Sequence, residues 1–544
     1  MKQLNLKQQV TAVGQKDLIS MGEGIDPSER LISPYPVKHP PGPLVCQGVK
    51  PTIDLVWFKR DLRLEDHGPL AAAARSPRPV LLCYALEPLL TDSAESDDRH
   101  WRFAYQGFQE LRVRLESQGH QLYLFHRNFD EVLRDLLQAY QIEELLSHQE
   151  TGLQASFARD RHVKALCQQH GIRWREWQQD GVFRGLASRD GWWARWEADM
   201  QAPLQRVDLS ALQTLTLPAE LVGHWVGGPL PGAWQQPAKG FQPGGSSYGW
   251  RYLQSFISER AEQYTRQLSK PAGSRLHSSR LSPYLAHGHL SVRQVYQAAR
   301  DAAARYPWAR EFERWHDRLW WRSHYMQKLE TEYQIEWRPI NHGLQSLERP
   351  LQEDVLLRFE QGQTGYPLVD ACMRCLKQNG YLNFRMRAML ATFATFALWQ
   401  PMTAVAQVLA RLFLDYEPGL HYGQMQMQSG LSGYHPLRLF NPIIQAERHD
   451  PQGDFIRQYI PELKDVPAPQ VFAPWRLSAL EQGLYHCQLG HDYPHPIVDY
   501  DTATQAAKDR YWAHRQSPAA QAYLPTLWQR HCLPGDKERY QALR

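Results

Sequence analysis

The sequence predicts a protein of two parts: an α/β domain with a doubly wound parallel sheet, followed by an all-helical domain. Short apolar runs alternate with helical patterns from residue 53 to about residue 180, and after residue 246 almost every segment has helical periodicity. A chain of 544 residues is also too long for a single hydrophobic core. The fold class therefore follows from the type and order of the predicted elements.

Five short apolar runs are the expected strands, at residues 53–58, 79–84, 121–126, 142–147 and 172–177. Helical patterns separate them. These include a short helix that Asp66 could cap and a longer one over residues 99–118 that stops at Gly119. The turn after the first strand, KRDLRLEDHG, contains no G-x-G-x-x-G, so the usual dinucleotide fingerprint is absent.

The second half is expected to hold helices at residues 247–268, 290–304, 309–330, 351–361, 367–379, 384–399 and 401–414. These patterns divide the chain into five segments: a flexible, proline-rich extension (1–50), the α/β domain (51–180), an inter-domain linker rich in Gly, Pro, Trp and Gln (181–245), the helical domain (246–510) and a C-terminal tail (511–544).

Composition excludes several classes of protein. No run of about eighteen apolar residues exists, and the first residues lack the apolar core of a signal peptide, so we expect neither a membrane span nor export. The seven cysteines are scattered, which is typical of reduced thiols in a cytoplasmic protein. Cys372 and Cys375 have no second pair at a matching spacing, so no metal cluster is expected. The formal net charge of +4 indicates nucleic-acid binding only weakly.

Nineteen tryptophans are a high count for this length. Large aromatic cores and stacking surfaces would explain them, as would electron hopping or a stacked cofactor. Composition alone favours the aromatic cores.

Residues 273–283, GSRLHSSRLSP, combine hydroxyls, backbone amides and two arginines just before a predicted helix. Such a loop can hold phosphate, because helix N-termini favour negative charge and Ser and Arg side chains complete the shell. An ordinary capped helix start explains the same residues equally well.

Two arginines, Arg385 and Arg387, fall in a strongly apolar helix and need partners, because an unpaired buried charge is costly. Asp415 is the candidate partner. The pair could lie beside a cofactor or be purely structural.

Four residues of one predicted helix, Trp315, Arg318, Trp321 and Arg322, have spacings of three and four that place them on one face. Such a face could stack bases or a flavin adenine and bind phosphate. A helix that packs its tryptophans into the core would look the same.

The order of these features along the chain resembles the photolyase/cryptochrome family from about residue 53 to residue 500. The segments that carry the resemblance are WFKRDLRLEDHGPL, GGSSYGWRYLQSF, SSRLSPYLAHGHLS, GQTGYPLVDACMR and FNPIIQAERHDPQGDFIRQYIPEL. The resemblance implies an antenna-type α/β domain, a long linker and a helical domain that binds FAD. Glu150 lies near a family antenna contact, so a second chromophore of unknown identity could bind in the N-terminal domain.

The resemblance also implies cofactor roles for residues of the helical half. Positions that hold the flavin ribityl and phosphates, or the edge of the cavity, correspond here to Tyr264, Ser278, Ser279, Arg280, Leu281, Ser282 and Trp315. Arg387 and Asp415 match the ion pair beside the isoalloxazine ring, and Glu417 falls where the family usually has Asp. His421 stands at the position facing flavin N5, where it could donate a proton or a hydrogen bond.

The substrate face departs from the family pattern. Trp321 and Arg322 match positions used for damaged DNA, and Arg385 is assigned to the same face. Arg318 stands where dimer photolyases carry Glu, Met427 replaces a Trp, and Phe384 replaces an Asn. A guanidinium only donates hydrogen bonds, so standard dimer recognition is not expected.

The family's usual tryptophan chain for electrons is also absent. Met425 occupies the flavin-proximal position, and the outer two positions fall near Met402 and Arg349. If the flavin is photoreduced, another path must serve, and the candidate residues are Trp399, Trp320, Trp337 and Tyr422.

The leading hypothesis is a DNA photolyase that uses light and FAD to transfer an electron to pyrimidine photoproducts, with His421 and Trp321 in catalytic roles. The lesion would be flipped into the cavity, and Arg and Lys around the rim would bind DNA phosphates. A cryptochrome-like photoreceptor without repair is the alternative, and a flavoprotein working in the dark is disfavoured because no nicotinamide fingerprint is present. The expected partner is DNA containing UV photoproducts, with no membrane contact, and we expect a monomer.

Overall fold

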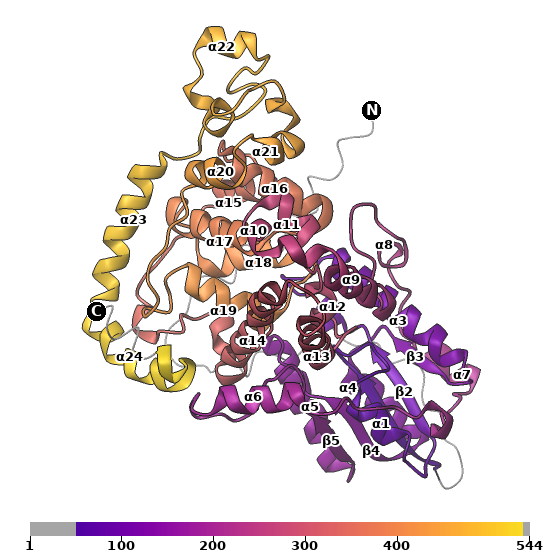
Figure 1. Cartoon of the computed structure of the whole chain (residues 1–544). Coiled ribbons are helices and arrows are strands. Elements are labelled where there is room, and N and C mark those ends of the chain that lie inside the picture. The colour runs from indigo at the N-terminus through magenta and orange to yellow at the C-terminus, as the bar shows by residue number, and fades with distance from the viewer. Residues whose placement is uncertain (1–49, 537–544) are drawn as a thin grey trace, which may run out of the picture. The chain divides into compact units, whose positions relative to one another are not determined.

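The computed structural model describes residues 50–536. The expected extension over residues 1–50 and the end of the tail lie almost entirely outside this range. Five strands form one parallel sheet in the order β3-β2-β1-β4-β5 (Figure 1). Their bounds are Thr52–Phe58 (β1), Val80–Ala85 (β2), Leu122–Phe125 (β3), Gln141–His148 (β4) and Arg173–Trp177 (β5). The predicted fold class, a doubly wound sheet followed by helices, is confirmed.

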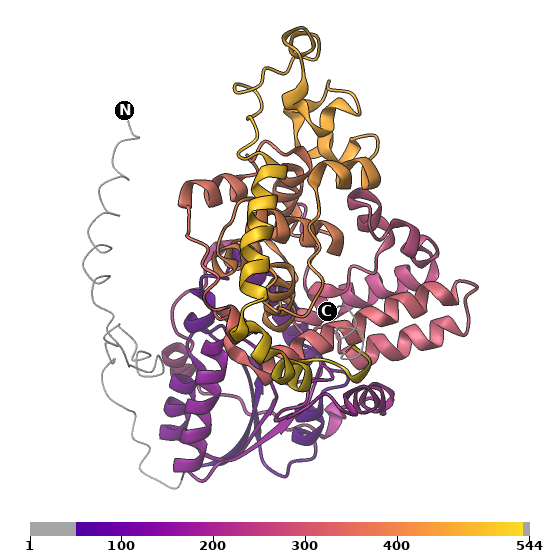
Figure 2. The ribbon, with the colours of Figure 1, turned by 90° about the vertical axis from the view of Figure 1, so that its left-hand side faces the viewer.

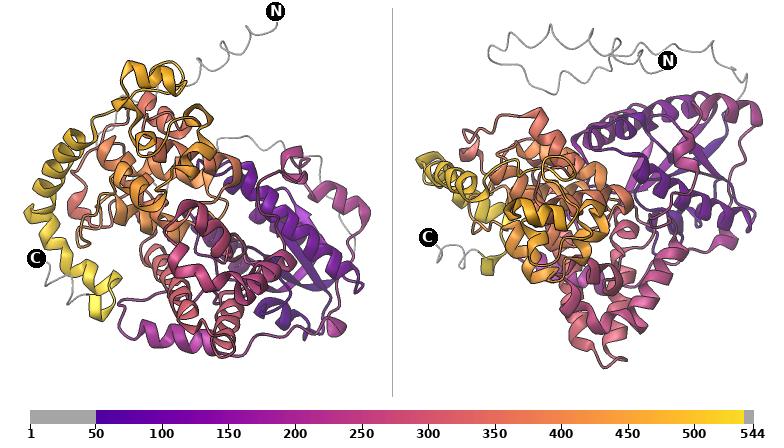
Figure 3. Two further views of the ribbon diagram at one scale, coloured as in Figure 1. Left: turned by 45° about the horizontal axis from the view of Figure 1, so that its top comes forward. Right: turned by 90° about the horizontal axis from the view of Figure 1, so that it is seen from above.

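Side chains of β1 alternate between two apolar layers, as a strand buried on both faces requires. Leu55 and Trp57 pack in the layer that contains α4 (Phe129–Ala139) and α5 (Gln154–Gln169). Val56 and Phe58 pack in the layer that contains α1 (Gly68–Ala73) and α3 (Asp98–Glu116). Helices therefore cover both faces of the sheet. Figure 3 shows the sheet and these helices beside the helices that follow residue 246.

The expectation that Asp66 caps the first helix is wrong. His67 is the N-cap of α1, and its Nδ1 accepts the backbone N–H of Leu70 at 3.0 Å. Asp66 has a φ of 51°, and its carboxylate accepts hydrogen bonds from Ser291 (2.6 Å) and Arg293 (2.8 Å) instead. Long-range partners thus take this side chain away from the local cap.

Residues 181–245, predicted as an inter-domain linker, contain three α-helices: α6 (Trp192–Gln201), α7 (Ala219–Trp225) and α8 (Gly232–Gln235). Trp192 and Trp196 of α6 are fully buried and belong to a core shared with the helical part. The α6 helix is therefore anchored rather than loosely connected.

The helical part begins at residue 246. Its α-helices are Ser246–Ser258 (α9), Tyr264–Gln267 (α10), Pro271–His277 (α11), Ser282–Ala286 (α12), Val292–Ala303 (α13), Ala309–Thr331 (α14), Glu353–Gln361 (α15), Pro367–Asn379 (α16), Phe384–Thr392 (α17), Met402–Leu412 (α18), Pro418–Gln428 (α19), Pro442–His449 (α20), Asp454–Tyr459 (α21), Ala479–Leu484 (α22), Tyr500–Arg515 (α23) and Pro518–His531 (α24). No helix within residues 50–536 is both long enough and apolar enough to cross a membrane.

Several predicted boundaries differ from the structure. The expected helix over 247–268 is interrupted after Ser258, and the one over 384–399 passes into a π-helical turn at Phe393–Ala397. The first residues of the expected loop 273–283 are helical, in α11. The proposed boundary at residue 510 falls inside α23, which lies along the outer side of the helical part (Figure 2).

Helices α14 and α19 approach each other closely because α19 carries glycine at the contact. A Cβ on Gly419 would lie 2.6 Å from Cα of Met326, and one on Gly423 would lie 2.7 Å from the ring of Tyr325. Since real Cβ atoms do not come this close, no other residue type fits these positions without separating the two helices.

Gly288, which follows α12, provides a test of how the fold positions the helical part. It has a φ of 66°, and a Cβ there would lie 2.0 Å from the carbonyl oxygen of Arg60. We expect Gly288→Ala to lower the free energy of unfolding by about 3 kcal/mol, from backbone strain and overpacking together. Urea unfolding of both proteins measures the difference.

The matched control is Gly232→Ala at the start of α8, where a new Cβ meets no atom within 4 Å. Because alanine also favours helix, this change should leave stability equal or slightly higher. Equal stabilities for the two variants would contradict the close approach at Gly288.

Candidate functional site

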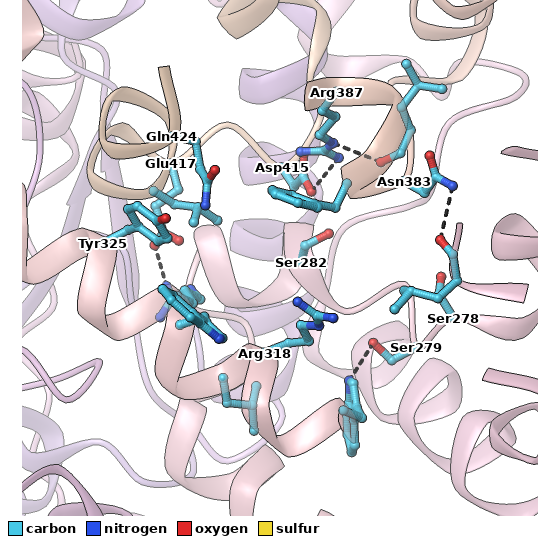
Figure 4. Close-up of a pocket in the computed structure, with 18 of the residues that line it drawn as sticks. Ser278, Ser279, Ser282, Arg318, Tyr325, Asn383, Arg387, Asp415, Glu417 and Gln424 are labelled. Atoms are coloured by element: carbon cyan, nitrogen blue, oxygen red, sulfur yellow. Dashed lines mark hydrogen bonds and ion pairs between the residues drawn. The ribbon is translucent and has the colours of Figure 1, made fainter. Parts of the chain in front are cut away.

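A cavity of about 540 Å³ lies between α14, α17, α19 and the segment from α10 to α12 (Figure 4). It brings together most of the predicted site residues, which are Tyr264, Ser278, Ser279, Arg280, Leu281, Ser282, Trp315, Arg318, Trp321, Arg322, Phe384, Arg387, Asp415, Glu417 and Met427. Two predicted residues do not line it. His421 lines a smaller adjoining cavity of about 100 Å³, and Arg385 stacks on Phe440, 5.9 Å from the ring centroid.

Hydroxyl and guanidinium groups gather at one end of the cavity. The Trp315 indole donates to Ser279 Oγ at 3.2 Å, and Ser278 Oγ lies 2.9 Å from the Tyr381 hydroxyl. Arg280, with a φ of 57°, lies over the Tyr381 ring at 3.8 Å and donates to Gln242 at 2.6 Å. Its buried Nε has no partner. This end can donate hydrogen bonds to an anion.

The Arg387–Asp415 ion pair lies at the opposite wall. Arg387 Nη2 is 2.9 Å from Asp415 Oδ2, and Arg387 Nε donates to the carbonyl of Leu382 at 2.8 Å. Burial raises the pKa of Asp415, but Arg387 and the Ser282 hydroxyl outweigh burial, so the pKa lies below its ordinary value. Asp415 therefore stays ionised at neutral pH, and its buried Oδ1 has no partner.

A second ion-pair group closes the wall beneath α19. Arg322, only 6% exposed, donates to Asp180 Oδ1 at 2.9 Å and pairs with Glu417 through a short contact. Burial raises the pKa of Glu417 even though Arg322 opposes this. Arg322, predicted to touch DNA, lines the cavity and pairs with these two carboxylates, while its buried Nε has no hydrogen-bond partner. Sequence reasoning missed Asp180.

An aromatic and cationic face forms the rest of the cavity. Trp321 stacks on Trp320, with centroids 4.5 Å apart, and lies 5.8 Å from Tyr325. The Tyr325 hydroxyl donates to the Met427 sulfur at 3.1 Å. Arg318 projects into the cavity from α14 (Figure 4). Flat rings beside a guanidinium suit a stacked base.

His421 is buried beside Asp415 and Arg387 in the adjoining cavity. Burial lowers the pKa of His421 to about 4, so the ring is neutral at pH 7. Its Nε2 lies 2.9 Å from the carbonyl oxygen of Ala406, which fixes the ring proton on Nε2.

Sequence reasoning missed other residues that line the cavity: Tyr325, Tyr381, Asn383, Gln424 and Arg438. Tyr325 follows Trp321 by four positions on α14, so its place on the same helix face could have been found from spacing. The others come from segments whose meeting depends on tertiary packing.

One buried group in the described part of the chain, Asp61, His67 and His148, is compact enough to share a metal ion. Because His67 Nδ1 accepts the N–H of Leu70, its ring proton lies on Nε2, which faces Asp61 Oδ2 at 3.1 Å. A metal would need that nitrogen free of its proton. His148 Nδ1 lies 2.6 Å from the same oxygen, and Asp61 also accepts the backbone N–H of Lys59 at 2.7 Å, so Asp61 links β4 to the loop after β1.

Comparison with known proteins decides the family. The model for the FAD binding domain of DNA photolyase matches residues 315–513, and the model for DNA photolyase matches residues 54–184. The chain belongs to the photolyase/cryptochrome family. The matched FAD-binding region begins at Trp315 and contains α15 to α22.

Relatives of the chain carry both family names. It is 28% identical over 480 residues to a deoxyribodipyrimidine photo-lyase of Alkalihalophilus pseudofirmus, covering 85% of this chain and 98% of the relative. It is 28% identical over 503 residues to a cryptochrome DASH of Synechocystis sp., with the same coverage of 85% and 98%. The crystal structure of a Synechocystis cryptochrome has a TM-score of 0.77 at 23% identity, over 85% of this chain and 99% of that chain. The family predicted from the sequence is confirmed.

The cavity of this photolyase/cryptochrome family member fits FAD chemically. Three residues that line it have a buried polar atom without a hydrogen-bond partner: Arg280 Nε, Asp415 Oδ1 and Gln424 Oε1. Arg280 and the serine hydroxyls would hold the phosphates, and Arg387 with Asp415 would hold the polar edge of the ring system. Such orphaned groups are costly unless a ligand satisfies them.

Asp415→Asn tests the paired wall. The change leaves Arg387, whose side chain is 23% exposed, without its counter-charge. We expect the free energy of unfolding at pH 7 to fall by about 2 kcal/mol, somewhat less than for a fully buried pair because water screens Arg387. The folded-state pKa of Asp415 lies below its ordinary value of 3.8. The stability difference between wild type and variant is therefore complete above pH 3.8, and it shrinks as the pH falls through the folded-state pKa.

The control is Glu462→Gln, which breaks the more exposed Arg374–Glu462 pair at 2.7 Å. This change should cost below about 1 kcal/mol. Urea unfolding at several pH values compares the variants. An Asp415→Asn effect no larger than that of Glu462→Gln would contradict the assignment.

Proposed function

We propose that this protein is a light-driven DNA repair enzyme that acts on pyrimidine photoproducts with FAD as its cofactor. The observation that carries the proposal is that one cavity joins an anion-binding end and an ion-paired wall to an aromatic, cationic face. The first two suit FAD, and the third suits a base flipped out of DNA. Flipping favours damaged bases because their stacking and pairing are already weakened.

Bound FAD would supply the absorption of light and the one-electron chemistry. The residues of the chain would bind the cofactor and orient the flipped base. Trp321 and Tyr325 offer rings on which a flipped base can stack, and Arg318 donates hydrogen bonds to its acceptor atoms. His421 is neutral at pH 7 and donates its Nε2 proton to the carbonyl oxygen of Ala406, so it adds no charge beside the Arg387–Asp415 pair.

A cryptochrome-like photoreceptor is the second candidate, and specific residues favour it. Arg318 cannot accept a hydrogen bond, and Met427 offers a thioether that Tyr325 already contacts. These two side chains leave the lesion face without an acidic acceptor, since Glu417 is paired with Arg322.

The deciding experiment uses the purified protein with reduced flavin and two oligonucleotides, one with a cyclobutane dimer and one with a (6-4) photoproduct. Light-dependent restoration of intact pyrimidines from either lesion supports repair and names the substrate. Bound FAD that responds to light while both lesions stay intact favours the photoreceptor. Absence of FAD even after reconstitution contradicts both.

Arg318→Ala tests the cationic face. We expect the affinity for the damaged oligonucleotide that the protein repairs to fall about tenfold, because one charged donor is lost. The salt dependence of binding should weaken for the same reason. The control is Arg314→Ala on the same helix, whose side chain is 59% exposed and does not line the cavity. Fluorescence anisotropy titrations at two salt concentrations measure both. Equal losses in the two variants would contradict a cavity role for Arg318.

A candidate place for a second chromophore is a cavity at the carboxyl end of β1 and β2 that Glu150 lines. Its volume is about 70 Å³, whereas ligand pockets span about 300–1,000 Å³. Arg159 fills the space, donating to Glu150 at 2.6 Å and pairing with Glu87. A second chromophore would have to displace this buried charge network.

We therefore expect one FAD per chain and no second chromophore in the purified protein. Absorption spectra and chromatography of cofactors released by denaturation measure the ratio. A second chromophore present in equal amount would contradict this expectation and show that Arg159 moves.

A further inference from the structure

A chain of three indoles leads from the cavity wall to the protein surface. Trp321 lines the cavity and stacks on Trp320, with centroids 4.5 Å apart and ring planes at 22°. Trp320 meets the edge of Trp193, with centroids 5.1 Å apart and planes at 84°. Trp193 is 41% exposed, so the outermost ring is in contact with solvent.

The two helices that carry these rings are held together firmly. Trp320 and Trp321 come from α14, and Trp193 comes from α6, which lies beside it (Figure 1). The neighbouring Trp196 is fully buried against Tyr296 and His316, at 5.6 and 6.4 Å. Since α6 is fixed by its buried face, Trp193 keeps its position against Trp320.

The other aromatic residues considered from the sequence lack one end of such a path. Trp399 lies between Arg349 and Arg510, at 4.8 and 5.3 Å, and two cations oppose a positive charge on its ring. Trp337 is close to Tyr333 at 5.8 Å and lines none of the three cavities described above. Tyr422 is buried and donates to Glu95 at 2.7 Å, away from solvent.

We propose that Trp193, Trp320 and Trp321 conduct electrons from a thiol reductant in solvent to photoexcited, oxidised flavin in the cavity. The inference rests on the flavin binding proposed above. It assigns a function to Trp193 and to α6, which belong to a segment first interpreted as a linker.

The electron balance is simple. Trp321 gives one electron to the flavin and takes one from Trp320, which takes one from Trp193. The oxidised Trp193 ring can release its indole proton to water, because it is exposed, and this slows the return of the electron. A thiolate in solvent then gives one electron to Trp193, which recovers its proton, and two resulting thiyl radicals couple to a disulfide. The thiol is oxidised, the flavin is reduced, and the indoles are unchanged.

The test compares Trp193→Phe and Trp320→Phe with wild type, all loaded with FAD. Phenylalanine keeps an apolar ring but is far harder to oxidise. We expect photoreduction by dithiothreitol to slow about tenfold or more in each variant. The control is Trp512→Phe, because Trp512 is 39% exposed on α23 and contacts Tyr511 rather than this chain of rings.

A second readout follows the path itself. Transient absorption after a laser flash should show a long-lived tryptophan radical in wild type and the Trp512 variant. Its lifetime should shorten in the Trp193 variant, because the charge can no longer reach solvent. Near-UV circular dichroism of the FAD-free proteins should lose the signal of the stacked pair only in Trp320→Phe.

The outcomes distinguish failure of the proposed electron path from failure of flavin binding. Unchanged photoreduction and unchanged radical lifetimes in Trp193→Phe and Trp320→Phe, with FAD bound, overturn the proposed path while leaving flavin binding intact. Failure of the wild type to bind FAD overturns the proposed function itself. Circular dichroism and melting temperature of each variant show that it is folded, and Trp193→Phe, at an exposed position, provides the result if Trp320→Phe is unstable.

Discussion

The close packing of α14 against α19 is the constraint on which the cavity depends. Gly419 and Gly423 let the backbone of α19 lie against Met326 and Tyr325. At the start of the same contact, Arg322 of α14 pairs with Glu417, the N-cap residue of α19. Separating the helices would unpair two buried charges and remove the apolar contacts at the same time. The ion pair and the helix packing therefore stabilise this wall jointly.

Electrostatics then determines what the cavity can accept. Its lining contains the arginines 280, 318, 322, 387 and 438 but only two acidic residues, and both of these are paired with arginine. The remaining field is positive. A ligand with a pyrophosphate and a nucleic-acid substrate both gain from such a field, whereas the paired charges on the walls keep their places. The same wall residues therefore fix structure and leave Arg280 and Arg318 to face the ligand.

The segment over residues 181–245 contains α6, which packs into the core through one buried face. It appeared to be a linker because it is rich in Gly, Pro, Trp and Gln without a clear period. However, Trp192, Trp196 and Met200 recur at a spacing of four and are all buried. That spacing is a helical signal, hidden by the short length of α6 and by the glycine before it. Because the face of α6 that contains Trp192, Trp196 and Met200 is buried, Trp193 lies between the solvent and Trp320.

The sequence by itself determined the positions of the five strands, most helices of the second half and the family, because periodicity and turn residues act locally. It also indicated the Arg387–Asp415 pair, since a guanidinium in an apolar helix needs a partner. Only the tertiary structure decided that Arg322 pairs with Asp180 and Glu417, residues 142 and 95 positions away. Only the tertiary structure brought Trp193 to Trp320. The reason is physical: such contacts depend on how rigid elements pack, and no local pattern encodes the meeting of distant surfaces.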